Sequence, residues 1–240
     1  MASPFTTQAT AQEIKPGEFM SPIPITVNDR AATREAIIKK IRSLNTAFAE
    51  RSSWGAVKGK TDMVMDWDYT MIALHHAGRS HSCTPGAEQM QDIQKDHLSQ
   101  RYDDIGYHYG IDCTGQVFEG RDIRLQGSSV LKFNTGVIGI VLLENLTTPE
   151  EGDDWIAKGR TVLDSLGYST TSAIPEVQII ALMHLIQSLK SVFVIKNFGG
   201  HREYPGQGAE GKICPGNIGM ELVRNIRAQT HLLPPPAPQE

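Results

Sequence analysis

The chain contains short, continuous apolar runs separated by segments in which apolar residues recur at helical spacing. Residues 71–74 and 137–143 are two such runs, and the second is rich in β-branched residues and leucine, as is typical of a strand at the centre of a sheet. Residues 107–111 and 116–119 flank Cys113-Thr114-Gly115, which predicts a turn between two hairpin strands. These four runs predict the strands of one sheet.

Other segments have the periodicity of helices. The first helix is expected after Asn28 or Asp29, since either residue could cap it. Its apolar positions at helical spacing are Ile37, Ile38, Ile41, Leu44 and Phe48. Further helices are expected at residues 89–100, 153–166 and 175–190, and a last one after Pro215 and Gly216. The 175–190 segment is apolar nearly all round, which predicts that it is buried.

Strands mixed with helices predict an α/β fold, with a single domain in which a central mixed β-sheet is flanked by helices. This domain is expected to cover residues 47–230. Residues 1–46 are interpreted as an N-terminal extension that contains the first helix. Residues 231–240 are interpreted as a Pro-rich tail, which is expected to be extended and to stay outside the core.

Composition excludes several classes of protein. With 240 residues, of which 40% are hydrophobic, the chain can bury one sizeable core. Its net charge of −4 gives no sign of a nucleic-acid partner, and no run approaches the ~18 apolar residues of a membrane span. The first 20 residues lack the basic start and apolar run of a secretory signal, so synthesis without a signal peptide is expected.

The cysteines are Cys83, Cys113 and Cys214. An odd number at such wide spacing does not indicate a disulfide framework. Cys83 and Cys113 are therefore predicted to be plain buried thiols, and at least one of the three cysteines is expected to be free or bound to a metal.

Three side chains near the ends of predicted elements could hold a metal. His75 and His76 end an apolar strand, so their side chains point to opposite faces and one of them can face a cleft. His201 follows Gly199-Gly200, and Cys214 lies on a loop that enters a helix. Two histidines and a thiolate suit zinc and leave a fourth position open. On spacing alone, buried residues without a metal are the commoner explanation.

A series of short motifs along the chain favours a metal site over buried residues without a metal. In chain order they occupy residues 51–56, 72–78, 93–97, 104–109, 115–121, 133–134, 138–140, 200–202 and 214–216. In this order they resemble the type-2 N-acetylmuramoyl-L-alanine amidases, the family that includes the peptidoglycan-recognition proteins and phage lysozyme-type amidases. The resemblance covers about 165 residues, and it is far more specific than any one of its motifs.

The resemblance implies a set of functional residues. It assigns three zinc ligands, His75, His201 and Cys214, and it selects His75 over its neighbour, which periodicity alone does not do. Members of the family that only bind peptidoglycan typically lack the cysteine. Tyr107 matches a tyrosine of catalytic members and Lys212 a lysine of the phage-type enzymes, and both are assigned catalytic roles.

Other residues have weaker assignments. By resemblance His108 and Asn134 bind substrate in the groove, but an exposed hairpin histidine and a turn-forming asparagine are ordinary alternatives. Glu119 and Arg121 are predicted to form a structural ion pair. The remaining histidines, among them His97, are assigned to the surface or to packing.

The chain departs from the family pattern at three places. Thirteen positions separate His201 from Cys214, so the 203–211 loop is enlarged, and its glycines and prolines are expected to let it bulge outward. Ser129 replaces a groove histidine of recognition proteins. Val141 replaces a strand glutamate of cytoplasmic recycling amidases, which makes Tyr107 the expected helper.

The resemblance implies a zinc amidase that hydrolyses the bond between muramic acid and the L-alanine of the peptidoglycan stem peptide. Bound Zn²⁺ would supply Lewis acidity and activate water for this attack. The alternatives are a peptidoglycan receptor that does not cut, an amidase-fold protein kept for structural or inhibitory interactions, a phage endolysin and a recycling amidase. An antibacterial toxin, exported by a non-classical route to the periplasm or outside the cell and paired with an immunity protein, is the expected biological setting.

Overall fold

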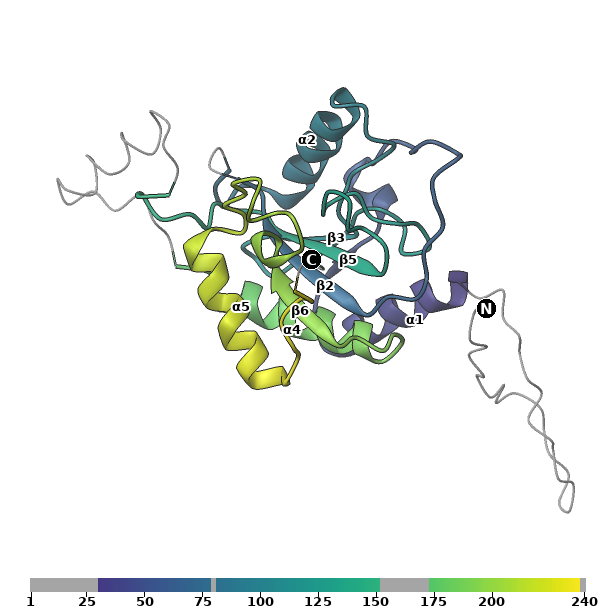
Figure 1. The fold of residues 1–240 in the computed structure, drawn as a ribbon. Coiled ribbons are helices and arrows are strands. Elements are labelled where there is room, and N and C mark those ends of the chain that lie inside the picture. Colours follow the sequence, from purple (N-terminus) through teal and green to yellow (C-terminus); the bar gives the residue numbers. More distant parts are fainter. Residues whose placement is uncertain (1–29, 79–80, 152–172, 238–240) are drawn as a thin grey trace, which may run out of the picture.

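The computed structural model describes residues 30–78, 81–151 and 173–237, and these form one α/β domain around a six-stranded mixed sheet (Figure 1). The strands lie in the order β1-β4-β3-β5-β2-β6. Their bounds are β1 (Phe48–Ala49), β2 (Met71–His76), β3 (Tyr109–Ile111), β4 (Val117–Glu119), β5 (Val137–Leu142) and β6 (Asn197–Gly200). The helices are α1 (Arg30–Ser43), α2 (Gly86–Ser99), α4 (Glu176–Lys190) and α5 (Gly216–Thr230), with short 3₁₀ turns η1 (Arg51–Trp54) and η2 (His201–Glu203).

The predicted fold class is confirmed, and the strand that looked most central by sequence is central. β5 pairs in parallel with β2 on one side and with β3 on the other, and β2 pairs in parallel with β6. The predicted hairpin is the antiparallel pair β3–β4. The helix expected at residues 153–166 lies outside the described residues.

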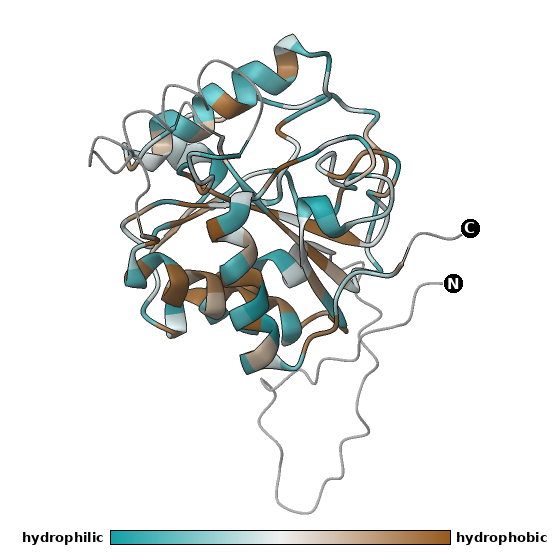
Figure 2. Ribbon diagram, turned by 60° about the vertical axis from the view of Figure 1, so that its left-hand side comes forward, coloured by the Kyte–Doolittle hydropathy of each residue, from teal (hydrophilic) through white to brown (hydrophobic). Residues whose placement is uncertain are grey.

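The two faces of the sheet carry separate clusters of buried side chains. The larger cluster joins α1, α4 and α5 to one face, and a smaller one joins Met90 and Ile93 of α2 to Val141 and Leu143 at the other. In Figure 2 the central strands are largely hydrophobic, whereas the helices have residues of both kinds. This is the layered arrangement expected when amphipathic helices cover a sheet.

Helix α1 belongs to this core, although the sequence placed it in an extension that ends at residue 46. Ile37, Ile38 and Ile41 are at most 2% exposed and join the cluster that contains α4. On the same helix, the Arg34 guanidinium bonds both carboxylate oxygens of the buried Glu119 in β4, at 2.5 and 2.7 Å. Apolar burial and a charge-assisted bidentate contact therefore both fix α1 to the domain.

The ion pair predicted between Glu119 and Arg121 is wrong. Glu119 is paired with Arg34, which comes from a distant part of the chain. The Arg121 guanidinium instead donates to the backbone carbonyls of Ile105, Asp104 and Gln126. β4 ends at Glu119, so the alternation of side chains along a strand does not extend to Arg121, which bonds backbone carbonyls outside the strands.

Two predictions about the C-terminal half need correction. Helix α4 is present as expected, but Val177 and Ile180 are 52% and 44% exposed, so the helix buries one side only. The Pro-rich tail is extended, yet Leu232 is 7% exposed and joins the core. Leu233 pairs with β6 through bonds from Phe198 N to its carbonyl and from its own N to the carbonyl of Lys196.

The prediction of free thiols at Cys83 and Cys113 is also wrong, because these residues form a disulfide. The bond joins the segment that follows β2 to the turn of the β3–β4 hairpin, and Cys214 is left as the free cysteine. Their separation of 30 residues does not reveal a pairing that depends on how the hairpin packs. Among the described residues, the helices are too short or too polar for any to cross a membrane.

If α1 is part of the cooperative core, Ile37→Ala should lower the free energy of unfolding by about 2–5 kcal/mol, because it leaves a cavity among fully buried neighbours. Urea unfolding followed by circular dichroism would measure the change. The exposed Lys39→Ala on the same helix is the matched control and should change stability little. Equal stability of the two variants would mean that α1 is a dispensable extension.

Candidate metal centre

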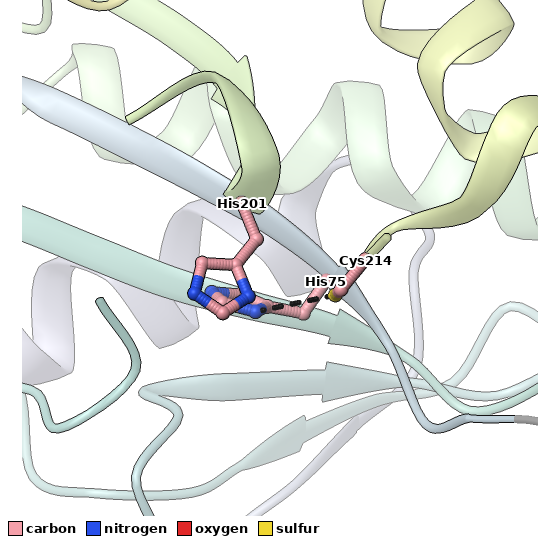
Figure 3. Close-up of side chains that lie close together, drawn as sticks. All are labelled: His75, His201 and Cys214. Atoms are coloured by element: carbon pink, nitrogen blue, oxygen red, sulfur yellow. Dashed lines mark hydrogen bonds between the residues drawn. The ribbon is translucent and has the colours of Figure 1, made fainter. Parts of the chain in front are cut away.

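Three side chains from distant parts of the chain meet at one edge of the sheet. His75 comes from β2, His201 begins η2 directly after β6, and Cys214 precedes α5 (Figure 3). One possible ligand atom from each lies within 4.8 Å of the other two. His75 Nδ1 lies 3.6 Å from Cys214 Sγ, and the two imidazole centroids are 4.4 Å apart.

Strand register explains how the two histidines meet. Leu74 of β2 is opposite Gly200 of β6 in a parallel pair, so the next residue of each chain segment is a histidine at the same edge. Parallel strands bring such positions together because their carboxyl ends coincide. His76 faces the opposite way, where its Nδ1 accepts a bond from Leu146 N, in line with the alternation of side chains along a strand.

Close backbone contacts place the cysteine. A side chain at Gly200 would collide with Met220 and Pro215, which lie 2.4 and 2.7 Å from the position of a Cβ atom. The absence of that side chain allows β6 to approach the start of α5. Arg202 N then donates to the carbonyl of Cys214 at 2.9 Å, which ties the cysteine segment to η2.

Burial sets the protonation states of this cluster. It lowers the pKa of His75 well below its ordinary value, helped by the neighbouring His201, and it lowers the pKa of His201 to about 4. Both imidazoles are therefore neutral at pH 7 and have a lone pair to offer. Burial raises the pKa of the Cys214 thiol to about 12, so a thiolate there requires a cation beside it.

The donor set fits a zinc ion. Ligand nitrogen and sulfur atoms bound to one tetrahedral zinc lie about 3.5 Å apart, given Zn–N and Zn–S distances of roughly 2.0 and 2.3 Å. The 3.6 Å separation of His75 Nδ1 from Cys214 Sγ agrees with this value. A cation would also stabilise the thiolate that burial disfavours.

A second cluster does not offer comparable ligands. Glu144 lies near Cys83 and Cys113, and burial raises its carboxyl pKa to about 7. The two sulfurs are joined in a disulfide, so they provide no thiolate. Within the described residues, His75, His201 and Cys214 are the group with free metal-binding atoms.

Tyr107 and Lys212, the predicted catalytic residues, both lie beside the cluster. The Tyr107 ring is half-buried, 4.9 Å from the ring of His75 and 5.3 Å from that of His97. Burial raises the Tyr107 pKa, so its hydroxyl is protonated at neutral pH and can donate a hydrogen bond. Lys212 is exposed and lies two residues before Cys214 in the chain. Its positive charge adds to the fall in the His201 pKa and partly opposes the rise in the Cys214 pKa that burial causes.

The two predicted substrate-binding residues, His108 and Asn134, both have partners within the fold. His108 is fully buried, and its Nδ1 accepts a bond from Gly139 N while its Nε2 lies 2.9 Å from the carbonyl of Leu125. This corrects the expected groove position, because both ring nitrogens are used inside the core. Asn134 Oδ1 accepts bonds from Ser129 N and Val130 N, which is the turn-forming role given as its alternative.

One residue near the cluster had no signal in the sequence. The enlarged 203–211 loop does not bulge outward as a whole, because Tyr204 and Gln207 turn inward and are 2% and 1% exposed. Gln207 Oε1 lies 3.1 Å from His201 Nε2. A glutamine among glycines reads as part of a solvated loop, and only the fold reveals that it faces a histidine.

With this geometry established, comparison with known proteins identifies the family. The family model of N-acetylmuramoyl-L-alanine amidases, Amidase_2, matches residues 66–217, which include all three candidate ligands. The chain therefore belongs to the Amidase_2 family.

Individual relatives are recognition proteins and an endolysin. Peptidoglycan-recognition proteins SC2 and LB of Drosophila melanogaster are 33% and 32% identical over 110 and 102 residues, or 44% and 41% of this chain. These matches span 59% and 44% of the two relatives, about half their length. Among solved structures, Drosophila PGRP-LB has 25% identity and a TM-score of 0.56, covering 77% of this chain and 95% of that one.

Two further structures share the fold at lower identity. Bumblebee PGRP-SA has a TM-score of 0.60 at 21% identity, covering 80% of this chain and 99% of that one. The endolysin LysCS of Clostridium intestinale, an N-acetylmuramoyl-L-alanine amidase, has a TM-score of 0.55 at 20% identity, covering 77% of this chain and 95% of the endolysin. The fold thus occurs both in proteins named for recognition and in an enzyme.

Proposed function

We propose that the chain is a zinc-dependent N-acetylmuramoyl-L-alanine amidase, which hydrolyses the amide bond between muramic acid and the L-alanine of the peptidoglycan stem peptide. The observation that carries this proposal is the convergence of His75, His201 and Cys214 within 4.8 Å, in a chain of the Amidase_2 family. Zinc held by these three side chains would supply Lewis acidity at an open fourth position, where an amide carbonyl can be polarised and water activated.

The surrounding residues have roles that follow from their charge and protonation. Hydrolysis of an amide places negative charge on the former carbonyl oxygen. The protonated Tyr107 hydroxyl can donate a hydrogen bond to that oxygen, and the Lys212 ammonium adds positive charge at the rim. Donors that are already in place when the charge develops are typically worth roughly 3–4 kcal/mol each.

The strand beside His75 supports this assignment of Tyr107. Val141 of β5 lies opposite His75 in the register, and it is fully buried among apolar neighbours. No carboxylate therefore reaches the cluster from that position of β5. Tyr107 packs against the His75 ring, so its hydroxyl is a candidate for this catalytic role.

A second candidate function is peptidoglycan binding without hydrolysis. It is favoured by the recognition proteins among the relatives and by solved neighbours whose complexes contain tracheal cytotoxin. The free Cys214 supports catalysis instead, because it completes a ligand set that binding alone does not need. Use of the activity as an exported antibacterial toxin stays a prediction from the sequence.

Analysis of digested peptidoglycan tests the function directly. The amidase should release glycan strands free of peptide, together with stem peptides that begin with a new L-alanine amino terminus. Mass spectrometry of the products would detect both. New reducing sugar ends would mean a glycosidase, and amino termini other than L-alanine would mean a peptidase. Intact peptidoglycan after incubation with zinc-loaded protein would favour the receptor.

Zinc should bind at about one equivalent per chain, and Cys214→Ser should lower both zinc content and activity, because it removes one of three protein ligands. Metal analysis of the purified protein would measure the first effect. The double variant Cys83→Ser/Cys113→Ser is the matched control, since these cysteines are joined to each other and should not affect zinc stoichiometry. Full zinc content in Cys214→Ser would exclude Cys214 as a ligand.

Tyr107→Phe should fold and retain zinc but lose roughly 10- to 1000-fold in kcat, because only a hydroxyl near the developing charge is removed. Steady-state kinetics on muropeptides would measure the loss. Tyr102→Phe is a suitable control, since it also removes one tyrosine hydroxyl, but the Tyr102 ring stacks on His97 and not on the candidate ligand His75. An unchanged kcat in Tyr107→Phe would assign this ring to packing and leave Lys212 as the main candidate.

A further inference from the structure

The enlarged loop between His201 and Cys214 contains one inward-facing amide side chain, that of Gln207. We infer that Gln207 is a positioning residue, which holds the His201 ring with its Nε2 protonated so that Nδ1 is left to bind the metal. This inference rests on the proposed function, because it concerns the same zinc ligand. Gln207 lies in the enlarged 203–211 loop, outside the short motifs that carry the family resemblance.

The orientation of the Gln207 amide follows from its partners. Its Nε2 donates to the carbonyl of Leu131 at 2.9 Å and lies 3.3 Å from the carbonyl of Pro205. Carbonyl oxygens only accept hydrogen bonds, so the NH₂ group must lie on their side. The Gln207 oxygen therefore faces His201, 3.1 Å from its Nε2.

This orientation determines the proton on His201. An amide oxygen cannot donate, so the hydrogen bond forms only if His201 Nε2 carries the proton. A neutral imidazole has one proton, which leaves the lone pair on Nδ1. In Figure 3 one ring nitrogen of His201 lies on the side of Cys214, and the other lies on the opposite side of the ring. The nitrogen left without a proton is thus available to the cluster.

The backbone of the loop keeps Gln207 in place. Gln207 N donates to the carbonyl of Tyr204, whose own hydroxyl donates to the carbonyl of Ile72 in β2 at 2.7 Å. Lys212 N donates to the carbonyl of Gln207 at 3.2 Å. One residue therefore connects the strand of His75, the ring of His201 and the segment that leads to Cys214.

The neighbouring glycines explain how a loop of this length can turn inward. Gly206 has φ +80°, a left-handed conformation that side chains disfavour, and it has open space around it. Gly206 and residues 208–211 are exposed. Gln207, which lies between them in the chain, is 1% exposed. The loop thus exposes its glycines and buries Gln207, whose side-chain oxygen faces His201.

Gln207→Met tests the inference, since methionine has a similar length but cannot accept this hydrogen bond. The zinc dissociation constant of the full chain, measured by competition with a chelator, should rise about 10- to 100-fold. Gln207→Glu should largely restore affinity, because a carboxylate oxygen can accept from His201 although it loses the bond to Leu131. Glu210→Ala, in the exposed part of the same loop, should bind zinc as the wild type does.

A second measurement separates positioning from simple anchoring of the loop. In the metal-free wild type, ¹⁵N NMR of the histidines should show His201 protonated at Nε2, and Gln207→Met should shift it toward the other tautomer. Loop anchoring alone would not produce this shift. If Gln207→Met does not fold, the wild-type spectrum decides, and protonation at Nδ1 overturns the inference.

The outcomes distinguish this inference from the proposed function. Tight zinc binding by the wild type with an unchanged constant in Gln207→Met would overturn the role of Gln207 and leave the amidase proposal intact. Failure of the wild type to bind zinc would remove the amidase proposal, and with it the metal-positioning role, whatever tautomer His201 adopts.

Discussion

The parallel pairing of β2 with β6 is the constraint on which the rest of the structure depends. It aligns the carboxyl ends of two strands that are more than 120 residues apart, so that each strand delivers a histidine to the same edge. The other residues of the metal cluster and its surroundings are placed relative to these two strand ends. Gly200 has no side chain, which lets the start of α5 approach β6, and Cys214 lies on the segment that enters α5. Tyr107, just before β3, packs against the His75 ring. Residues positioned by paired strands are held more precisely than residues positioned by loops.

Burial gives this edge its chemical character. Both imidazoles are neutral at pH 7 because desolvation disfavours their charged forms, and for the same reason the Cys214 thiol resists ionisation. The cluster thus combines two good nitrogen donors with a sulfur that becomes a good donor only beside a cation. Without a metal the Cys214 sulfur is a neutral thiol, and with a metal it is a thiolate. Metal binding should therefore release the thiol proton.

The sequence predicted the features that depend on local pattern or on an ordered motif. The central strand at residues 137–143 followed from composition, and His75, His201 and Cys214 came together because their motifs carry a known arrangement. Features set by tertiary contact were missed or misread. Cys83 and Cys113 pair only because the hairpin packs beside the segment after β2. Arg34 reaches Glu119 only because α1 packs beside β1, the strand that pairs with β4. Likewise His108, polar in sequence, is accommodated in the core by two backbone partners.

The docking of the tail on β6 has a consequence for association between molecules. β6 is the last strand of the sheet, and an uncovered edge strand presents backbone groups to which a strand of another chain can add. Leu233 occupies that edge through its own backbone bonds. The next three residues, Pro234, Pro235 and Pro236, have no N–H group to offer to a further strand. The proline run therefore prevents a further strand from pairing with the tail. It should protect the native protein against aggregation through strand pairing.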